Sequence, residues 1–471
     1  MERINGNDLL NLGYDENKML GIALQINKKR TGYTRQEMLD HYKAVLENPE
    51  VYKEDKVFKT LAVALLNKEE LLAKTIPLRE TAETYRVYGA EQIEQGAIDQ
   101  MNTAMLLPVT VAGALMPDAH QGYGLPIGGV LATNNAVIPY GVGVDIGCRM
   151  ALSVFDLPSA LIETKLDWLT DIIIDHTAFG AGNGFRGKEK SDHSVLENPL
   201  FAEHAFIKNL KDKAWTQLGS SGGGNHFVEF GMMQFAEDDE VLGIKKGEYL
   251  ALLTHSGSRG LGATIADHYT RLAKQICELP YKAQNLAYLD LNSEAGQEYW
   301  LAMNLAGDYA SANHEIIHAK ITKALGAEVL AKVENHHNFA WKEVLNGEEV
   351  IVHRKGATPA GKGVMGIIPG SMATPGFLVR GRGEPEAIHS ASHGAGRLMS
   401  RTQAIKTYTR GTLNKILKEE GITLIGSGMD EVPMAYKDIH TVMAEQKDLV
   451  DVVATFHPKI VRMADDGSKE D

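Results

Sequence analysis

The chain has little cysteine and no long apolar run. These absences argue against a disulfide-rich secreted protein and against a membrane-spanning protein. Only Cys148 and Cys277 are cysteines among 471 residues, too few for the disulfide framework of a secreted domain. No stretch of about 18 apolar residues occurs, so the sequence predicts no membrane span. Residues 1–19 lack the apolar core of a secretory signal. We therefore expect a cytoplasmic protein.

Internal repeats are also missing, and the candidate phosphate-binding glycines do not match the common nucleotide-binding fingerprints. Neither the segment 222–224 nor the segment 370–371 matches GxxxxGK[ST] or GxGxxG, which argues against a P-loop or a dinucleotide-binding fold there. Glycine-rich segments at Gly222–Gly224 and at Gly370 and Ser371 are instead candidate anion cradles, because successive backbone N–H groups there can face phosphate oxygens. These segments are weak signals by themselves.

The net charge of −13 argues against nucleic acid as a partner when it is taken alone. The charge is unevenly distributed along the sequence, however. Residues 353–410 hold nine Lys or Arg and only two acids, a local balance of +7. Since salt screens each charge beyond about 8–10 Å, this local excess outweighs the total.

Strand and helix patterns alternate along most of the chain, which predicts an α+β fold with a complex mixed sheet. Residues 1–80 read as a helical appendage, residues 81–464 as one catalytic domain and residues 465–471 as a polar tail. Thr34 and Glu37 form a capping-box pattern that starts a helix. Further helices are predicted at 57–74, 159–173, 262–278 and 295–325, and strands at 150–155, 226–230, 249–254 and 350–353.

The stretch from Met116 to Met150 contains seven glycines and the tetrapeptide from Asp145 to Cys148. A turn of this length can aim the carboxylate and the thiol at one point. Together with imidazoles, such a pair suits Mn²⁺, Zn²⁺, Fe²⁺ or Co²⁺. The alternative is that Cys148 is a small buried apolar residue, as we expect for Cys277 in its helical pattern.

Histidines follow a glycine loop, a strand end and a tight polar turn at His226, His255 and His337. Positions at the ends of different elements favour a shared site over a place in the core. His336 leaves the last assignment open, because adjacent residues rarely point the same way. The remaining histidines, such as His193, His314 and His318, are expected at ordinary surface or helix positions.

A fourth histidine, His393, lies among small residues in SASHGAGR. An imidazole can carry a phosphoryl or nucleotidyl group covalently. Arg397 could then neutralise charge on the phosphate. The alternative is that His393 caps a helix starting near Ala395.

Nine blocks of this sequence in order resemble the RtcB-type RNA-splicing ligases. They are MPDAHQGYGLPIGG, GVDIGCRM, GGGNHF, THSGSRG, HHNFAW, HRKGATPA, IPGSMATPG, SASHGAGRLMSR and DEVPMAYKDI. The resemblance implies a fold unrelated to classical ligases, two Mn²⁺ ions and GTP. It also implies joining of RNA 2′,3′-cyclic phosphate or 3′-phosphate ends to 5′-hydroxyl ends.

The resemblance further implies a role for individual residues. Cys148 would bridge both ions, His255 and His337 would complete one, and Asp145 with His226 the other. His393 would be guanylylated, and Asn225 would contact the nucleotide phosphate. The implied nucleotide-binding set is Asn225, Glu229, His337, Asn338, Pro369, Gly370, Ser371, Met372, His393, Gly394, Ala395, Gly396 and Tyr436.

The sequence departs from the family at two places expected to contact guanine. Gly376 and Phe377 stand where the family has a serine–tyrosine pair. Arg462 and Met463 stand where a lysine is expected near the end. We therefore expect GTP to be preferred with weaker discrimination than is typical; the alternative is that Arg462 replaces the lysine.

The same motifs are compatible with two other functions. The chain could cap a 3′-phosphate or hydrolyse a cyclic phosphate without joining ends, or it could be a metal-stabilised RNA-binding protein without catalysis. An intact His393 speaks against the second, because a protein that only binds RNA needs no nucleophile.

Overall fold

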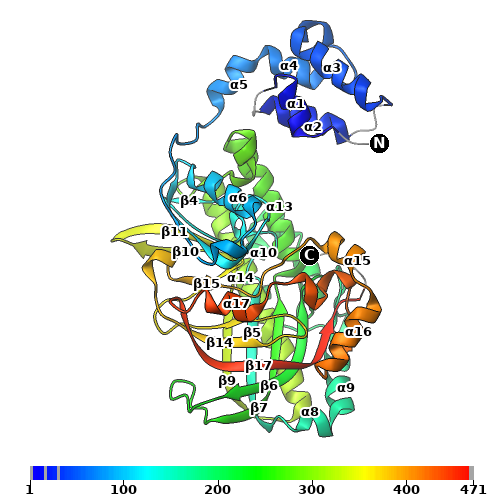
Figure 1. The fold of residues 1–471 in the computed structure, drawn as a ribbon, viewed down its shortest axis with the longest axis vertical. Helices are drawn as coiled ribbons and strands as arrows, with labels where there is room; N and C mark the ends of the chain where they lie inside the picture. Colours follow the sequence, from blue (N-terminus) through cyan, green and yellow to red (C-terminus); the bar gives the residue numbers. More distant parts are fainter. Residues whose placement is uncertain (1–3, 15–17, 29–31, 466–471) are drawn as a thin grey trace.

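The computed structural model describes residues 4–14, 18–28 and 32–465 and has a mixed helix and sheet architecture, which confirms the α+β class (Figure 1). The strands are β1 (Arg86–Val87), β2 (Thr110–His120), β3 (Ile127–Thr133), β4 (Ala136–Val137), β5 (Arg149–Pro158), β6 (Phe227–Phe235), β7 (Gly247–Ser256), β8 (Leu289–Asp290), β9 (Val329–His336), β10 (Asn338–Leu345), β11 (Glu348–Lys355), β12 (Ala357–Pro359), β13 (Met365–Ile368), β14 (Gly376–Gly381), β15 (Ser390–Ser392), β16 (Thr423–Ile425) and β17 (Val450–Met463). The helices are α1 (Gly6–Asn11), α2 (Lys18–Lys28), α3 (Arg35–Glu47), α4 (Lys59–Leu66), α5 (Lys68–Lys74), α6 (Gln95–Met105), α7 (Pro139–Val142), α8 (Leu161–Thr164), α9 (Leu166–His176), α10 (Leu200–Glu203), α11 (Ala205–Lys208), α12 (Lys211–Gln217), α13 (Arg259–Ile276), α14 (Glu294–Leu325), α15 (Arg401–Thr407), α16 (Arg410–Glu419) and α17 (Ile439–Ala444).

The larger sheet has the strand order β13-β14-β17-β6-β7-β5-β9, with β16 added beside β17. Its two ends meet, because β13 also contacts β9. Asn335 joins these ends: its side-chain amide donates to the Ile367 carbonyl at 3.3 Å, and its oxygen accepts from the Ile367 N–H at 2.9 Å. The sheet therefore curls around an apolar interior that includes Leu253 and Leu378.

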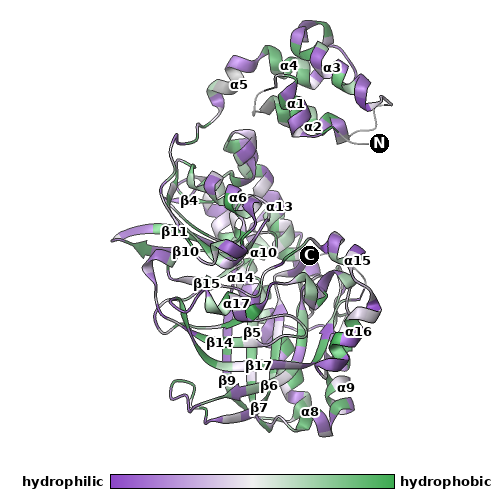
Figure 2. Cartoon of the chain, viewed as in Figure 1, coloured by the Kyte–Doolittle hydropathy of each residue, from purple (hydrophilic) through white to green (hydrophobic). Residues whose placement is uncertain are grey.

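Helices α9 and α14 cover the outer face of this sheet. Alternation along a strand sends neighbouring side chains to opposite faces. Leu252 accordingly packs against Ile317 of α14, whereas Leu253 belongs to the interior. Figure 2 shows hydrophobic colouring along much of the sheet.

The second sheet has the order β1-β2-β3-β11-β10. His337 is the single residue between the end of β9 in the large sheet and the start of β10 in this one. The short pair of β12 and β15 adjoins both sheets, since β12 contacts β3 and β9. The junction of the sheets thus gathers segments from distant parts of the sequence.

Helices α1–α4 share a core of their own in the unit at the top of Figure 1, and α5 follows α4. Leu9, Tyr42 and Phe58 are fully buried there. The predicted capping box of Thr34 and Glu37 is confirmed at the start of α3. From the rest of the chain, Tyr281 packs against this core, in the 3₁₀ turn η5 (Tyr281–Leu286).

Two predicted helices are wrong in extent. The helix expected over 57–74 is two helices, because Asn67 leaves the helical conformation between α4 and α5. The helix expected over 159–173 is broken at Lys165, whose φ of −135° is not helical. The other predicted helices and strands are present with shifted ends. Of the predicted tail, 466–471 lie outside the described residues. Among the described helices, none is long and apolar enough to cross a membrane.

Candidate active site

Four adjacent strands of the large sheet bring the candidate ligands together. In the order β6-β7-β5-β9 every neighbouring pair is antiparallel, so the start of one strand lies beside the end of the next. Cys148 immediately precedes β5 and His226 immediately precedes β6. His255 lies near the end of β7, and His337 follows β9. All four side chains therefore lie at the same end of these four strands.

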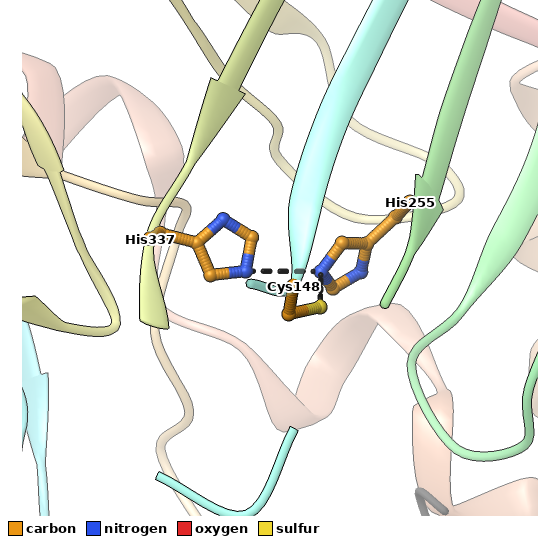
Figure 3. A group of neighbouring side chains, drawn as sticks. All are labelled: Cys148, His255 and His337. Carbon is orange, nitrogen blue, oxygen red and sulfur yellow. Dashed lines mark hydrogen bonds between the residues drawn. The ribbon is translucent and has the colours of Figure 1, made fainter. Parts of the chain in front are cut away.

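The first group of donors is the thiol of Cys148 and two imidazoles. The Cys148 Sγ lies 3.1 Å from His255 Nε2, and this nitrogen lies 3.2 Å from His337 Nε2. Figure 3 shows the two rings approaching the sulfur from β7 and from the end of β9. The carbonyl oxygen of Asn225, 3.0 Å from His255 Nδ1, accepts a hydrogen bond from that nitrogen and leaves Nε2 as the inward donor.

The second group shares the same sulfur. His226 Nε2 is 3.5 Å from Cys148 Sγ and 3.0 Å from Asp145 Oδ2. The other oxygen of Asp145 accepts hydrogen bonds from the backbone N–H and the hydroxyl of Ser258. Burial would raise the pKa of the Asp145 carboxyl, but the hydrogen bond and charge of His226 lower that pKa on balance.

The donor atoms in each group lie within 4.8 Å of one another, and all five side chains are buried. Ligands about 2.0–2.3 Å from a tetrahedral ion would be roughly 3.3–3.8 Å apart, close to the spacings seen here. Burial holds the pKa values of His255 and His337 well below the usual value, so both imidazoles are neutral donors. The two groups fit a pair of metal ions that share a thiolate.

His336, the neighbour that left the assignment open, does not join these groups. Its ring lies 5.0 Å from that of Phe339 and 4.9 Å from that of Trp341, measured between centroids. His314 and His318 lie on a helix as expected, but a surface position is wrong for them. Both are buried on α14 and hydrogen-bond the hydroxyl of Thr254, the residue before the candidate ligand His255.

His393 lies beside this centre, with its ring centroid 5.0 Å from that of His337. Its Nδ1 is 2.6 Å from Oδ2 of Asp118, which is fully buried on β2. The same oxygen accepts from the backbone N–H groups of His393 and Gly394. Burial would raise the pKa of Asp118, but attraction and hydrogen bonding from His393 lower it, so the carboxylate is ionised.

Asp118 was missed by the sequence analysis. It lies 275 residues before His393, and its one signal was its place in the glycine-rich stretch that also carries Asp145 and Cys148. The suggestion that His393 caps a helix near Ala395 is wrong, because the next helix, α15, begins at Arg401.

The glycines around His393 allow the close approach of other segments. Gly396 has a φ of +74°, and a Cβ there would lie 2.0 Å from the Asp118 carbonyl oxygen. A Cβ on Gly394 would lie 3.3 Å from the Pro369 carbonyl oxygen. The segment of predicted nucleotide residues 369–372 therefore adjoins the segment 393–396. Ser371 holds its turn through a hydrogen bond from its N–H to the Thr374 hydroxyl at 2.7 Å.

The side chains of Asn225 and Asn338 differ in whether their polar atoms already have hydrogen-bond partners. The Asn225 Oδ1 is buried without a hydrogen-bond partner, so it remains able to accept. Asn338 is already engaged: its Oδ1 accepts from the Gly356 N–H at 2.9 Å, and its amide donates to the Asp145 carbonyl at 3.3 Å.

Arg397, expected beside a phosphate, is already engaged by an ion pair and hydrogen bonds. Its guanidinium donates to Glu431 at 3.0 Å and to the Tyr436 hydroxyl at 3.3 Å, and lies 5.1 Å from the Tyr436 ring centroid. The Tyr436 hydroxyl in turn donates to Glu431. Burial and the neighbouring Glu431 raise the pKa of Tyr436 well above its usual value. Tyr436 is thus a neutral aromatic side chain that the ion pair of Arg397 and Glu431 holds in place.

The end of β17 settles which side chain lies near Tyr436. Arg462 donates to the carbonyls of Ile173 and Ile174 at the end of α9, on the outer face. Met463 packs in the apolar cluster that contains Tyr436. This position speaks against the alternative in which Arg462 replaces the family's lysine, because strand alternation sends Arg462 to the other face.

The basic stretch is largely neutralised by ion pairs. Among the nine Lys and Arg of 353–410, five are paired with carboxylates: Arg354 with Glu343, Arg380 with Asp239, Arg382 with Asp451, Arg397 with Glu431 and Arg401 with Asp430. The +7 of this stretch is therefore not a free positive surface.

Comparison with known proteins identifies the family. The family model described as tRNA-splicing ligase RtcB matches residues 99–464. The RNA-splicing ligase RtcB of Escherichia coli strain K12 is 36% identical over 405 residues, which cover 77% of this chain and 93% of that protein. The tRNA-splicing ligase RtcB of Nanoarchaeum equitans is 31% identical over 451 residues, which cover 80% of this chain and 94% of that protein. Helices α1–α5 lie outside the family match. The chain belongs to the RtcB family of RNA-splicing ligases, and it is an RNA ligase.

Proposed function

We propose that this ligase uses GTP and two Mn²⁺ ions to join RNA ends that carry a 2′,3′-cyclic phosphate or 3′-phosphate to ends that carry a 5′-hydroxyl. Its task would be RNA repair or tRNA splicing. The proposal rests on one observation: His393, oriented by a buried carboxylate, lies against a ligand of a paired donor site.

The chain's own residues determine how His393 would react. With the Nδ1–H donated to Asp118, the lone pair of Nε2 is free to attack. Asp118 also stabilises the positive charge that develops on the imidazole. Nε2 would bond the α-phosphorus of GTP while the bond to the bridging oxygen breaks and pyrophosphate leaves.

Two further transfers complete the reaction. An oxygen of the RNA 3′-phosphate attacks the phosphorus of the histidine adduct, the P–N bond breaks, and a guanylylated RNA end forms. The 5′-hydroxyl oxygen of the second RNA then attacks the 3′-phosphorus and releases GMP, and its proton passes to water. A cyclic phosphate first has to be opened by water to a 3′-phosphate.

Five residues would hold the ions. Cys148, His255 and His337 form one donor group, and Asp145, Cys148 and His226 the other. Thiolate and imidazole donors suit Mn²⁺ alongside Zn²⁺, Fe²⁺ or Co²⁺. Divalent ions there supply charge neutralisation and orientation for phosphoryl transfer.

The nucleotide would occupy the space bounded by 369–372, 393–396 and Tyr436. Asn225 would contact the phosphate through its amide Nδ2, because an amide nitrogen donates and phosphate oxygens accept. The buried Glu229 on β6 is the acceptor proposed for the guanine edge.

Incubation with Mn²⁺ and each labelled nucleoside triphosphate tests the proposal. We expect GTP to label the protein and His393→Gln to remain unlabelled. One labelled RNA then reports whether ends are joined or only capped. Capped RNA without joined product would replace ligation by 3′-phosphate capping, and labelling of the His393→Gln variant would overturn the nucleophile.

A further inference from the structure

We propose that Tyr123 and Tyr140, flanked by Lys274 and Lys355, form a binding subsite for a nucleotide of single-stranded RNA beside the reacting end. We call these four residues the Tyr123 subsite. The inference rests on the proposed function, since it supplies an RNA contact for that reaction.

Tyr123 is exposed although its backbone is firmly held. Tyr123 exposes 70% of its surface to solvent. On one side, Gln100 donates to the Gly122 carbonyl at 2.6 Å and accepts from the Gly122 N–H at 3.0 Å. On the other, Gly124 lies against the backbone of Asn285 in η5, where a Cβ would be 2.6 Å from a carbonyl oxygen. A fixed loop thus presents an aromatic ring to solvent, which is the form of a preorganised stacking surface.

Tyr140 extends this surface and brings two cations to it. Its ring lies edge-on to that of Tyr123, with centroids 6.1 Å apart. The Lys355 ammonium is 5.3 Å from the centroid of Tyr140, and that of Lys274 is 5.5 Å away. Aromatic rings interleaved with cations are typical of surfaces that bind single-stranded nucleic acid.

The two ammonium groups are not neutralised by acids. Lys355 donates to the carbonyls of Tyr123 and Tyr140, and Lys274 donates to the Asn285 side chain at 2.6 Å. Among the residues that the structure describes, no carboxylate forms an ion pair with either lysine.

The carboxylate whose charge acts on Tyr140 is already engaged. Burial and the charge of Asp267 raise the pKa of Tyr140, and Asp267 pairs with Arg271 at 2.7 Å. Burial lowers the pKa of Lys274, and it lowers that of Lys355 to about 7. A phosphate bound between them would favour the protonated form of both amines, because an anion stabilises the positive charge.

The position of the subsite connects it to the reaction. Lys355 is followed by Gly356, whose N–H donates to the His337 carbonyl at 2.7 Å. A Cβ on Gly356 would lie 3.2 Å from Cε1 of His393. The residue next to Lys355 in the chain, Gly356, therefore lies against the ring of the proposed nucleophile, His393. A nucleotide held here would place the adjoining phosphodiester near His393.

The chemistry of the subsite suits an RNA nucleotide. A base can stack on an exposed tyrosine whatever its identity, and a lysine can contact the phosphate without reading sequence. Both RNA ends carry these groups, so the two strands have to be distinguished by experiment.

Fluorescence anisotropy with two separate oligonucleotides, one ending in a 3′-phosphate and one in a 5′-hydroxyl, tests the subsite. We expect Tyr123→Ala to weaken binding of at least one strand by about tenfold to a hundredfold, and Tyr123→Trp to retain it. Trp168→Ala is the control, since Trp168 is exposed on α9 outside the subsite. A loss confined to one oligonucleotide assigns the subsite to that strand.

The lysines are tested through salt dependence. Lys274→Gln should lower the slope of log affinity against log salt by about one unit, because one phosphate contact is lost. Lys342→Gln is the matched control, since Lys342 also lies near an aromatic ring, that of Trp300, but outside the subsite. Unchanged binding of both strands by Tyr123→Ala, with an unchanged slope for Lys274→Gln, would overturn the proposal.

Labelling with GTP in the absence of RNA separates this inference from the proposed function. The Tyr123→Ala variant should label as the unaltered protein does, which also shows that it folds. Failure of the unaltered protein to label with any nucleoside triphosphate would sink the proposed function, whereas the RNA-binding result would still decide the subsite.

Discussion

The proposed metal cluster (Asp145, Cys148, His226, His255 and His337) and the proposed nucleotide rim (369–372, 393–396 and Tyr436) adjoin one another but are built differently. In the cluster, buried side chains at the ends of strands point at common centres. In the rim, glycines and turns shape the backbone, and Tyr436 is held by an ion pair between Arg397 and Glu431.

The difference shows where substitution is tolerated. A donor set needs particular atoms at particular spacings, so each cluster residue is fixed by chemistry. A rim built from backbone and packing can exchange side chains and keep its shape. The departures that the resemblance predicts at Gly376 and at Arg462–Met463 fall at the rim or on its flank, and all five predicted ligands lie together in the cluster.

The largest effect is expected for Cys148→Ala. The thiolate belongs to both donor groups, so its loss should remove or disorder both ions and abolish labelling by GTP. Metal content by mass spectrometry is the measurement. Two ions retained per chain would contradict the shared thiolate. Cys277→Ala, a buried cysteine at the end of α13, is the control and should keep metal and labelling.

His393→Ala should abolish labelling but keep the metal. The residue lies outside both donor groups, so binding and chemistry should separate. The variant should still seal an RNA whose 3′-phosphate already carries GMP, because that step bypasses the histidine. Failure on this substrate with full metal content would mean that His393 has a second role.

Asp118→Asn should slow labelling by roughly a hundredfold or more without loss of metal. An amide in place of the carboxylate favours the wrong imidazole tautomer and stabilises the developing charge less. Single-turnover labelling rates measure the effect. A mainly structural role predicts lower melting temperature with an unchanged labelling rate. The folded-state pKa of Asp118 is lowered, so its stabilising contribution is present above the ordinary carboxyl pKa and declines as pH falls.

A smaller effect is expected in the choice of base. Guanine offers N1–H and an amine to Glu229, but burial raises the pKa of Glu229 well above its usual value. A neutral carboxyl has one donor and one acceptor, which also match adenine. We expect GTP to be preferred, with ATP competing better as the pH falls and the carboxyl is protonated. Competition against labelled GTP is the measurement. Failure of ATP at a thousandfold excess, about 4 kcal/mol, would contradict weakened selectivity.

The smallest effect on nucleotide choice is expected for Arg462→Ala. Its guanidinium bonds the carbonyls that end α9 and does not reach the cluster around Tyr436. The ratio of GTP to ATP labelling should stay within about twofold, while loss of these hydrogen bonds lowers stability by about 1–3 kcal/mol. A changed ratio with unchanged stability would place Arg462 in the rim after all.

The sequence by itself predicted which residues are candidates for the chemistry. Asp145 and Cys148 are close enough in the chain for one turn to join them, and the small residues around His393 mark a site of close approach. Local periodicity also gave most of the helices and strands, because it depends on near neighbours. It failed at Lys165 and Asn67, where a single residue leaves the helical conformation within an apolar pattern.

Only the tertiary structure decided which of these residues meet. The order β6-β7-β5-β9 joins His226, His255 and His337, and a contact across 275 residues gives Asp118 to His393. Pairing across the fold neutralised most of the basic stretch, and the pleat of β17 turned Arg462 away from Tyr436. Strand order and register arise from packing between distant segments, which the local sequence pattern does not contain.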